Sequence, residues 1–295
     1  MKERLTQPLV SICLPVYNGA GRMHRAVDSL LGQTYPHIEL ILSDNCSTDS
    51  TPHICETYKN SDARVRFVRQ QENIGQVRNM FASLQEARGE YVMLASDDDW
   101  WHPRFIEDVL SLLLKYPHHG VAMSSFARTD DEGNIKSIVS YAGDIDLTKK
   151  NYCAVARRMI MRAPIHIFLY GIYRREALMP LLKRPPPACL FWDRIFMTEA
   201  ALSFRFATLP EVRFHKTYSS RPAKKRLSNE AIGAAYRDSL AYTHYLGMFF
   251  RRVWASDTIP VRRKPCMIIP WLCLCWHFRR SLVFEWRRLY HAGNI

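Results

Sequence analysis

The 295-residue chain has no apolar segment long enough to cross a membrane. Its longest apolar stretch, Cys266 to Phe278, has 13 residues and contains Pro270, whereas a spanning helix needs about 20 apolar residues. Met1 to Pro8 is short and mostly polar, so the start of the chain also has no apolar signal-peptide core. We therefore expect a cytoplasmic protein without a membrane-spanning helix.

Cysteine pairs of the C-x-x-C type are also missing, as is any internal repeat. The eight cysteines are scattered along the chain, at positions 13, 46, 55, 153, 189, 266, 273 and 275. This spacing argues against the common zinc and redox motifs. We expect reduced thiols that mostly belong to the core.

The composition is that of a folded protein with a basic end. Hydrophobic residues make up 47% of the chain and charged residues 23%, which argues against disorder. The net charge is +13, and residues 221–295 hold 14 Lys or Arg against 4 Asp or Glu, which leaves +10 in that segment. A basic segment can meet nucleic acid, anionic lipid or an acidic substrate, and charge alone does not choose among them.

The first 125 residues alternate short β-branched or aliphatic runs with amphipathic stretches. In order, these are 9–14, 22–33, 38–42, 52–59, 65–69, 76–88, 90–95, 103–116 and 121–124. Such alternation predicts a mostly parallel, Rossmann-like sheet flanked by helices. Further along, we expect a hairpin turn at 130–134, strands at 165–173 and 204–209, an extended proline linker at 185–187, and helices from about 191 and over 229–254.

Polar residues gather where three of the predicted strands end. The first strand runs into Pro15-Val16-Tyr17-Asn18-Gly19, the second into residues 43–49, and the fourth into residues 96–100. In open parallel sheets, ligands bind outside the carboxyl ends of the strands. We therefore expect these three loops to converge on one binding site.

Asp97, Asp98 and Asp99 are three successive carboxylates, which repel each other unless a cation offsets their charge. Oxygen ligands suit Mg²⁺ or Mn²⁺, which usually bridge a carboxylate to phosphate oxygens. The alternative interpretation is an acidic helix start, with Asp98 or Asp99 capping the helix after Pro103.

The second loop also has two interpretations. Asp44, Asn45 and Asp49 have the chemistry of a turn and a helix cap before Pro52. Alternatively, Asp44 contacts the base or ribose of a nucleotide, and Tyr17 stacks on that base rather than being an ordinary surface aromatic.

Taken together, these motifs resemble a known family. The matching segments are Val10–Asn18, Ser29–Thr34, Ile38–Asp49, Asn73–Gly75, Arg78–Asn79, Gly89–Tyr91 and Asp97–Pro103. They resemble family 2 glycosyltransferases with a GT-A fold. The resemblance is dense from residue 9 to about 110, thinner to about 220, and absent beyond.

The resemblance implies an inverting enzyme that uses a nucleoside-diphosphate sugar, a UDP-sugar being favoured, together with Mg²⁺ or Mn²⁺. It places Asp98 on the metal, with Asp99 as a second ligand. The residues that it places around the donor are Pro15, Val16, Tyr17, Asn18, Asp44, Asn45, Gly75, Arg78, Asn79, Asp97 and Arg221. Two positions depart from the family pattern, because Asn45 and Ser96 stand where Asp is common.

Inverting transfer needs a carboxylate that takes the proton from the acceptor hydroxyl. Asp193 opens a helical stretch where the family usually carries an acidic pair, although Trp192 replaces the first acid. The alternative is a helix-cap Asp paired to Arg194. His215, Lys216 and Arg221 resemble the basic segment that closes over the diphosphate in many relatives, and a solvated basic loop is the other interpretation.

We expect three divisions: residues 1–125 bind the nucleotide sugar, residues 126–228 bind a saccharide or lipid-linked acceptor, and residues 229–295 form a helical, basic segment. Residues 260–290 combine bulky apolar side chains with cations, which is typical of helices at an anionic membrane surface, or else of a core helix with a basic face. Cell-surface polysaccharide or glycolipid synthesis is the expected role, with peripheral contact on the cytoplasmic face of a membrane.

Three other functions remain open. A nucleotide-binding but catalytically inactive relative would explain Ser96 and Trp192. Nucleic-acid binding through the basic tail lacks any RNP, KH, zinc-finger or helix-turn-helix pattern, so we expect no nucleic acid partner. A nucleotidyltransferase would carry a glycine-rich basic loop after the first strand, and Pro15–Asn18 is not such a loop.

Overall fold

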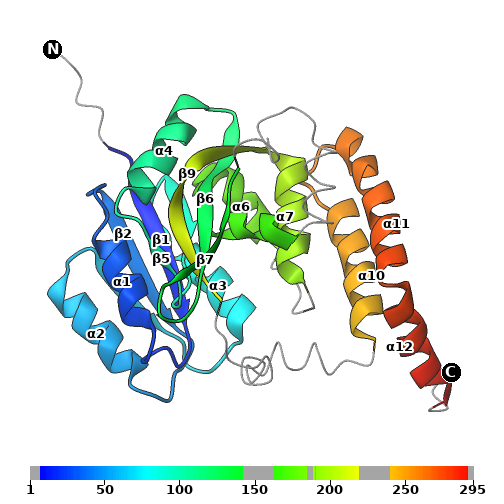
Figure 1. Ribbon diagram of the computed structural model, residues 1–295, viewed down its shortest axis with the longest axis horizontal. Helices are drawn as coiled ribbons and strands as arrows, with labels where there is room; N and C mark the ends of the chain where they lie inside the picture. The colour runs from blue at the N-terminus through cyan, green and yellow to red at the C-terminus, as the bar shows by residue number, and fades with distance from the viewer. Residues whose placement is uncertain (1–6, 142–162, 185–188, 190, 219–239, 292–295) are drawn as a thin grey trace. The chain divides into compact units, whose positions relative to one another are not determined.

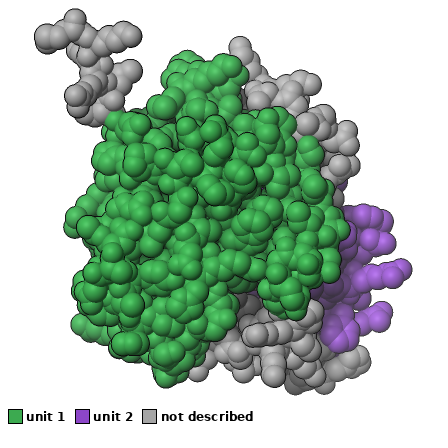
Figure 2. All heavy atoms as spheres, turned by 60° about the vertical axis from the view of Figure 1, so that its left-hand side comes forward, with its two compact units in different colours: residues 1–148, 170–182, 206–220 green, residues 149–169, 183–205, 221–295 purple. Residues whose placement is uncertain are grey.

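The computed structural model describes residues 7–141, 163–184, 189, 191–218 and 240–291. Within it, the chain forms two compact units, shown in different colours in Figure 2. Unit 1 comprises residues 1–148, 170–182 and 206–220, and unit 2 comprises residues 149–169, 183–205 and 221–295. Arg221, the proline linker 185–187 and the expected helix start at Asn229 lie outside the described residues.

Unit 1 is built on a sheet whose described strands follow the order β3-β2-β1-β4-β8-β6-β9-β5, with β7 paired to β6 (Figure 1). The strands are β1 (Val10–Val16), β2 (Ile38–Asp44), β3 (Val65–Arg69), β4 (Tyr91–Leu94), β5 (Trp100–Trp101), β6 (His119–Thr129), β7 (Ile135–Val139), β8 (Ile172–Arg174) and β9 (Arg205–Thr217). The flanking helices are α1 (Met23–Leu31), α2 (Thr51–Ser61), α3 (Gln76–Gln85), α4 (Phe105–Lys115) and α6 (Arg175–Leu182).

The first four strands form the parallel half that the alternating pattern predicts. β1 pairs in parallel with both β2 and β4, and β2 pairs in parallel with β3. All seven residues of β2 are buried, as expected for a parallel strand covered on both faces. Helix α1 buries Met23, Ala26, Val27 and Leu30, which share one face at helical spacing.

The other half of the sheet is antiparallel. β8 pairs with β4 and β6, and β6 forms a hairpin with β7 whose turn contains Gly133 at φ 92°, so the predicted turn at 130–134 is confirmed. The strand predicted at 165–173 is largely wrong, because Ala163–Tyr170 is a 3-10 helix and only β8 follows it. The apolar character of that run reflects burial, which a helical segment shares with a strand.

A group of aromatic side chains holds β5 and β9 in place within unit 1. Phe214 of β9 lies 5.3 Å from the ring of Trp101, 6.4 Å from Phe126 and 6.5 Å from Phe105. All four side chains are at most 1% exposed. Tilted aromatic pairs of this kind add to the stabilisation that their burial provides. They fix the two short segments next to the acidic loop.

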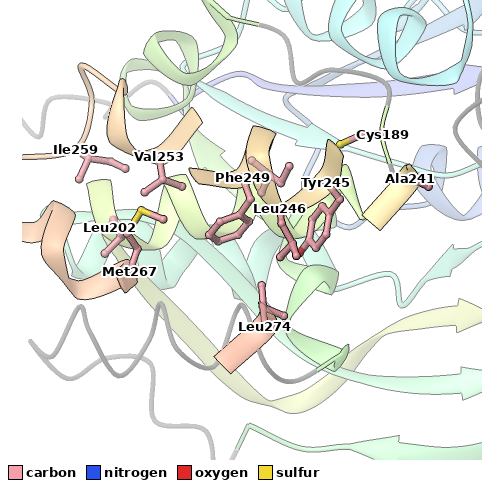
Figure 3. Close-up of a cluster of buried hydrophobic side chains, with 11 residues drawn as sticks. Cys189, Leu202, Ala241, Tyr245, Leu246, Phe249, Val253, Ile259, Met267 and Leu274 are labelled. Carbon is pink, nitrogen blue, oxygen red and sulfur yellow. The ribbon is translucent and has the colours of Figure 1, made fainter. Parts of the chain in front are cut away.

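Unit 2 is helical, with α7 (Trp192–Ser203), α10 (Ala241–Trp254), the 3-10 helix η2 (Val261–Met267), α11 (Ile268–His277) and α12 (Arg279–His291). Its core includes Leu202, Tyr245, Phe249 and Leu274 (Figure 3). Cys266 is disulfide-bonded, which corrects the expectation that every cysteine is a free thiol. Among the described residues, we find no helix with the length and apolarity needed to span a bilayer.

Candidate functional site

The loops after β1 and β2 are bonded to each other, as the strand-end argument predicts. The amide of Asn18 donates to Ser47 Oγ (2.9 Å), and Asn18 Oδ1 accepts from the amide of Thr48 (2.9 Å). The amide of Gly19 donates to Thr51 Oγ1 (2.8 Å), which begins α2. These bonds cross between neighbouring parallel strands and make the two loops one surface.

Each of these loops holds a non-glycine residue in a left-handed backbone conformation. Asn18 has φ 47° and Cys46 has φ 59°. Asn tolerates this region, but a Cys there costs about 1–3 kcal/mol and persists only where the surroundings enforce it. Such backbone strain gathers at ligand-binding sites, so both loops are candidates for contacts with a ligand.

Asp44 and Asn45 lie at the carboxyl end of β2, and both bond to the protein itself. Asp44 is fully buried, accepts the amide of Ser47 at 3.2 Å and lies 3.2 Å from Arg69 Nε. Asn45 Oδ1 accepts the amide of Ile74 at 3.0 Å. Asp49 bonds the amide of Thr51 at 3.0 Å, which is the turn chemistry that the sequence indicates.

The segment before α3 lies beside these loops. Gly75 has φ 85°, which a side chain would strain, and it is the N-terminal cap residue of α3. Asn79 is buried and tied to β2, since its Nδ2 donates to the Ser43 carbonyl and its Oδ1 accepts from Ser43 Oγ, both at 2.8 Å. Arg78 is exposed. Asn79 therefore connects α3 to the end of β2, next to the loop that follows β2.

The residues at the end of β1 differ from one another in exposure. Val16 is buried, and its carbonyl accepts the amide of Asn45 at 2.9 Å. Pro15 and Tyr17 are partly exposed. The Tyr17 carbonyl accepts Arg22 Nη2 at 3.2 Å. A partly exposed ring at the end of β1 suits stacking on a base.

Asp97 is paired with an arginine that sequence reasoning overlooked. Arg22, the cap residue of α1, lies with Nη2 2.6 Å from Asp97 Oδ2, and its Nη1 donates to the Asn18 carbonyl at 2.9 Å. Burial raises the pKa of Asp97 to about 6, although Arg22 opposes the rise. Arg22 thus connects the loop after β1 to the acidic loop after β4.

Asp98 is the most accessible of the three acidic residues. Its side chain is 40% exposed, against 13% for Asp97 and 0% for Asp99. Oδ1 accepts Ser96 Oγ at 2.5 Å and lies 4.0 Å from Lys216 Nζ. Burial works to raise the pKa of Asp98, but Lys216, Ser96 and Arg22 outweigh it and hold that pKa below its usual range.

Asp99 is bonded on both oxygens. Oδ2 lies 2.7 Å from Lys216 Nζ, and Oδ1 accepts the amide of Thr217 at 2.9 Å. Burial raises the pKa of Asp99 to about 7. Lys216 also lies 4.5 Å from the centre of the Tyr170 ring. The carboxylate of Asp99 thus ties β9 to the acidic loop, and Asp98 has more freedom to meet a ligand.

Neither Asp98 nor Asp99 caps the following helix. α4 has Arg104 as its cap residue, and no side-chain hydrogen bond closes its N-terminus. The alternative interpretation of the acidic residues as helix caps is therefore wrong. The bonds that these residues do make run to Ser96 and to β9.

His215 and Lys216 are held by contacts within the protein and do not form a solvated basic loop. The His215 ring stacks on Trp100, with centroids 3.4 Å apart and planes 7° apart. Burial, with the charges of His102 and Arg25, lowers the pKa of His215 to about 4, so it is neutral at pH 7. Lys216 is occupied by Asp99.

Asp193 lies in the first turn of α7, in unit 2. Among the described residues, its carboxylate accepts no hydrogen bond, and Arg194 instead lies over the ring of Phe191 at 4.8 Å. Glu199, on the same helix, is buried and bonded to Arg252 Nε (2.8 Å) and to Ser256 Oγ (2.6 Å). Of the two carboxylates on α7, Asp193 is the one without such partners.

Gly19 allows the close approach of the β1 loop to Asp97, and this gives a test. A Cβ at residue 19 would lie 2.5 Å from Val16 Cγ2 and 2.8 Å from Asp97 Oδ2. We expect Gly19→Ala to lose about 1–3 kcal/mol of unfolding free energy, as overpacking does, and to weaken nucleotide binding. The matched control is Gly21→Ala, because a Cβ there meets nothing within 4 Å. Equal effects of the two substitutions in urea unfolding would contradict this account.

Comparisons with known proteins identify relatives of this chain. Residues 11–182 match the model of glycosyl transferase family 2. A putative teichuronic acid biosynthesis glycosyltransferase, TuaG, of Bacillus subtilis (strain 168) is 36% identical over 109 residues. Those residues are 37% of this chain and 43% of TuaG, so less than half of that relative is matched.

Two solved structures share the fold. S. aureus TarS 1–349 in complex with UDP-GlcNAc has a TM-score of 0.68 at 20% identity, over 93% of this chain and 74% of that one. The mannosyltransferase PcManGT from Pyrobaculum calidifontis, in complex with GDP-Man and Mn²⁺, has a TM-score of 0.53 at 18% identity, over 95% and 85%. These likenesses confirm the expected GT-A type of fold, with a helical C-terminal region.

Proposed function

Because this chain belongs to glycosyl transferase family 2, we propose that it transfers a sugar, with inversion, from a nucleoside-diphosphate sugar to an acceptor hydroxyl. A UDP-sugar is the favoured donor, since TarS has been solved with UDP-GlcNAc. The observation that carries the proposal is the half-exposed Asp98 carboxylate, set at the strand ends beside the bonded loops of β1 and β2.

The donor would lie over the ends of β1, β2 and β4. Tyr17 is partly exposed for stacking on the base, with Pro15 and Asn18 in the same loop. Asp44 and Asn45 hold the second loop in shape through their own bonds, and Gly75 and Asn79 support it. Arg78 is an exposed cation beside this segment. We propose Arg221 as a further contact to the donor.

The acidic loop fits a divalent metal held jointly with the donor. Among the described residues, no group of three or more His, Cys, Asp or Glu could hold a metal alone. Mg²⁺ and Mn²⁺ commonly use one or two carboxylates and complete their shell with phosphates. Asp98 would be the main ligand, with Asp99 beside it, and the metal would supply charge neutralisation for the departing diphosphate.

Asp193 would take the proton from the acceptor hydroxyl as that oxygen attacks the anomeric carbon. Asp193 lies in the first turn of α7, and its carboxylate accepts no hydrogen bond among the described residues, so both oxygens are available to take a proton. The acceptor is a saccharide or a lipid-linked saccharide, in cell-surface polysaccharide or glycolipid synthesis. We keep residues 1–125 as the donor half, 126–228 as the acceptor half and 229–295 as a segment in peripheral contact with the cytoplasmic face of a membrane.

A donor screen tests the function. Binding and slow hydrolysis of UDP-, GDP- and dTDP-sugars are measured with Mg²⁺, with Mn²⁺ and with a chelator. We expect one donor to bind, and Asp193→Asn to keep that binding while losing at least about a hundredfold in turnover, as removal of a general base does. Glu211→Gln, at an exposed position of β9, is the control.

Three outcomes would count against the proposal. If no nucleotide sugar binds under any metal condition, the transferase function fails. If Asp193→Asn keeps full turnover, the base lies elsewhere. If a donor binds but neither hydrolysis nor transfer occurs with any acceptor, the catalytically inactive alternative replaces it.

A further inference from the structure

The outward face of α11 and α12 is apolar, although it faces solvent. On α11, Ile269, Leu272 and Trp276 are 69%, 54% and 69% exposed. They follow the spacing i, i+3, i+7, so they share one side of the helix. On α12, Val283 and Trp286 are 51% and 50% exposed. A surface helix ordinarily presents polar residues on this side, and a contiguous apolar patch marks an interaction site.

These exposed side chains are not core residues left over from a loose packing. The inward sides of the same helices are already filled: Leu274 of α11 is 1% exposed and packs in the cluster with Leu246 and Phe249 (Figure 3). Trp271 Nε1 donates to the Leu246 carbonyl at 3.0 Å, which fixes the rotation of α11 about its axis. The outward face is therefore additional to the core of unit 2.

α12 is held in the same way. Glu285 is 6% exposed, and its carboxylate accepts the amides of Tyr242 and Thr243 at 2.8 and 3.1 Å. It also accepts Thr243 Oγ1 at 2.9 Å. These bonds cap the N-terminus of α10, where a carboxylate also complements the helix dipole. With Glu285 turned inward, Val283 and Trp286 face away from the helix pair.

The charges around this face are all of one sign. Residues 260–290 contain seven Lys or Arg and one acid, Glu285, which is buried in the cap of α10. Arg279 and Arg280 are exposed at the start of α12. Arg279 also lies over the Trp276 ring, 4.4 Å from its centre. Cations at the edge of bulky apolar anchors are the composition of a helix that lies in an anionic membrane interface.

We propose that this outward face, formed by Ile269, Leu272, Trp276, Val283 and Trp286 with Arg279 and Arg280, docks on an anionic lipid bilayer. The apolar side chains enter the interface, and the arginines meet the headgroups. A second copy of the chain would bring like charges together, which opposes pairing through this face. A nucleic acid would satisfy the arginines but leave the apolar side chains in water. This docking rests on the membrane contact proposed above for residues 229–295 and is independent of the transfer chemistry.

Vesicle flotation tests the proposal with the full chain, without any donor. Vesicles of phosphatidylcholine alone are compared with vesicles in which about a third of the lipid is phosphatidylglycerol. Both are measured at low and at high salt. We expect binding to the anionic vesicles only, weakened by salt. Arg279→Gln with Arg280→Gln should lower the partition coefficient by about twenty-fivefold, since each cation near the surface contributes a factor of about five.

The apolar part is tested by Trp276→Ser with Ile269→Ser, which should lower partitioning at least tenfold. The control is Ile138→Ser, which removes a similarly exposed apolar side chain, 59% exposed, from unit 1. Circular dichroism and donor binding should be unchanged in all three variants, since none of these side chains lies in the core. The Asp98→Asn variant should still float with the vesicles. Membrane binding can therefore be judged even if the proposed transferase function is wrong.

Four results would overturn the proposal. The first is no binding to either vesicle. The second is equal binding to neutral and anionic vesicles. The third is retention on RNA with no vesicle binding, which would favour nucleic acid. The fourth is a dimer that the two apolar substitutions convert to a monomer while vesicle binding is absent, which would assign the face to a second copy.

Discussion

Replacing Asp98 by asparagine is expected to abolish metal-dependent donor binding and to lower turnover by at least about a thousandfold, or about 4 kcal/mol of barrier. Among Asp97, Asp98 and Asp99, Asp98 has the largest exposed fraction, and only its Oδ1 accepts a hydrogen bond from Ser96. Asparagine keeps the shape of the side chain but loses the charge that a divalent cation requires. Isothermal titration of the donor with Mn²⁺ and Mg²⁺ measures binding, and product formation measures turnover.

The matched control is Glu132→Gln, which removes an exposed acid from the β6–β7 turn. It should leave both donor affinity and turnover within about twofold, as surface substitutions away from a site do. Retained metal-dependent binding in Asp98→Asn would contradict the assignment. In that case the main ligand would be sought at Asp97, whose side chain is 13% exposed, before the fully buried Asp99.

Replacing Lys216 by methionine is expected to cost about 3–5 kcal/mol of unfolding free energy, because it leaves the buried Asp99 carboxylate without its cation. Lys216 Nζ lies 2.7 Å from Asp99 Oδ2, and the carboxylate is fully buried. Urea unfolding followed by tryptophan fluorescence measures the loss. Trp100 and Trp101 directly follow Asp99 and report on this part of the sheet.

Two further variants test whether the loss of stability comes from the buried Lys216–Asp99 ion pair or from the change in packing. Lys59→Met breaks an exposed Lys–Glu pair, with both side chains about half exposed, and should cost under about 1 kcal/mol. The double variant Lys216→Met, Asp99→Asn should recover part of the loss, since no buried charge then lacks a partner. A loss below about 1 kcal/mol in Lys216→Met alone would show that the pair does not hold β9 to the acidic loop.

The parallel half of the sheet could be predicted from the sequence because each of its strands is short, apolar and followed by a helix at regular spacing. The antiparallel half could be predicted only in part, since the turn at 130–134 is recognisable from its residues but β8 and β5 are not. The run at 165–173 is apolar in a helical segment as well as in β8, and burial gives both the same composition. The two-residue strand β5 lies among residues that the sequence presents only as a metal-binding loop.

The candidate site could also be predicted only in part from the sequence. Local motifs located the loops at Asn18, Asp44 and Asp98, because each directly follows a predicted strand. They did not reveal that Asp99 pairs with Lys216, since those residues are 117 positions apart and no local pattern links them. Arg22 was overlooked for a different reason. An arginine at the start of a helix is ordinarily solvated, and only the structure brings it to Asp97.

The long sequence separation between Asp99 and Lys216 affects how the chain folds while it is being translated. Translation adds about 5–20 residues per second, so the lysine follows its carboxylate by roughly 6–23 seconds. During that interval the nascent chain carries the acidic triplet without the strand that compensates it. The parallel strands can pair while the ribosome is still working, but the acidic loop at Asp97–Asp99 reaches its final form only after β9 has been synthesised. Stalling or truncation before residue 216 would therefore yield a chain with a partly formed sheet and an acidic loop that lacks its buried cation.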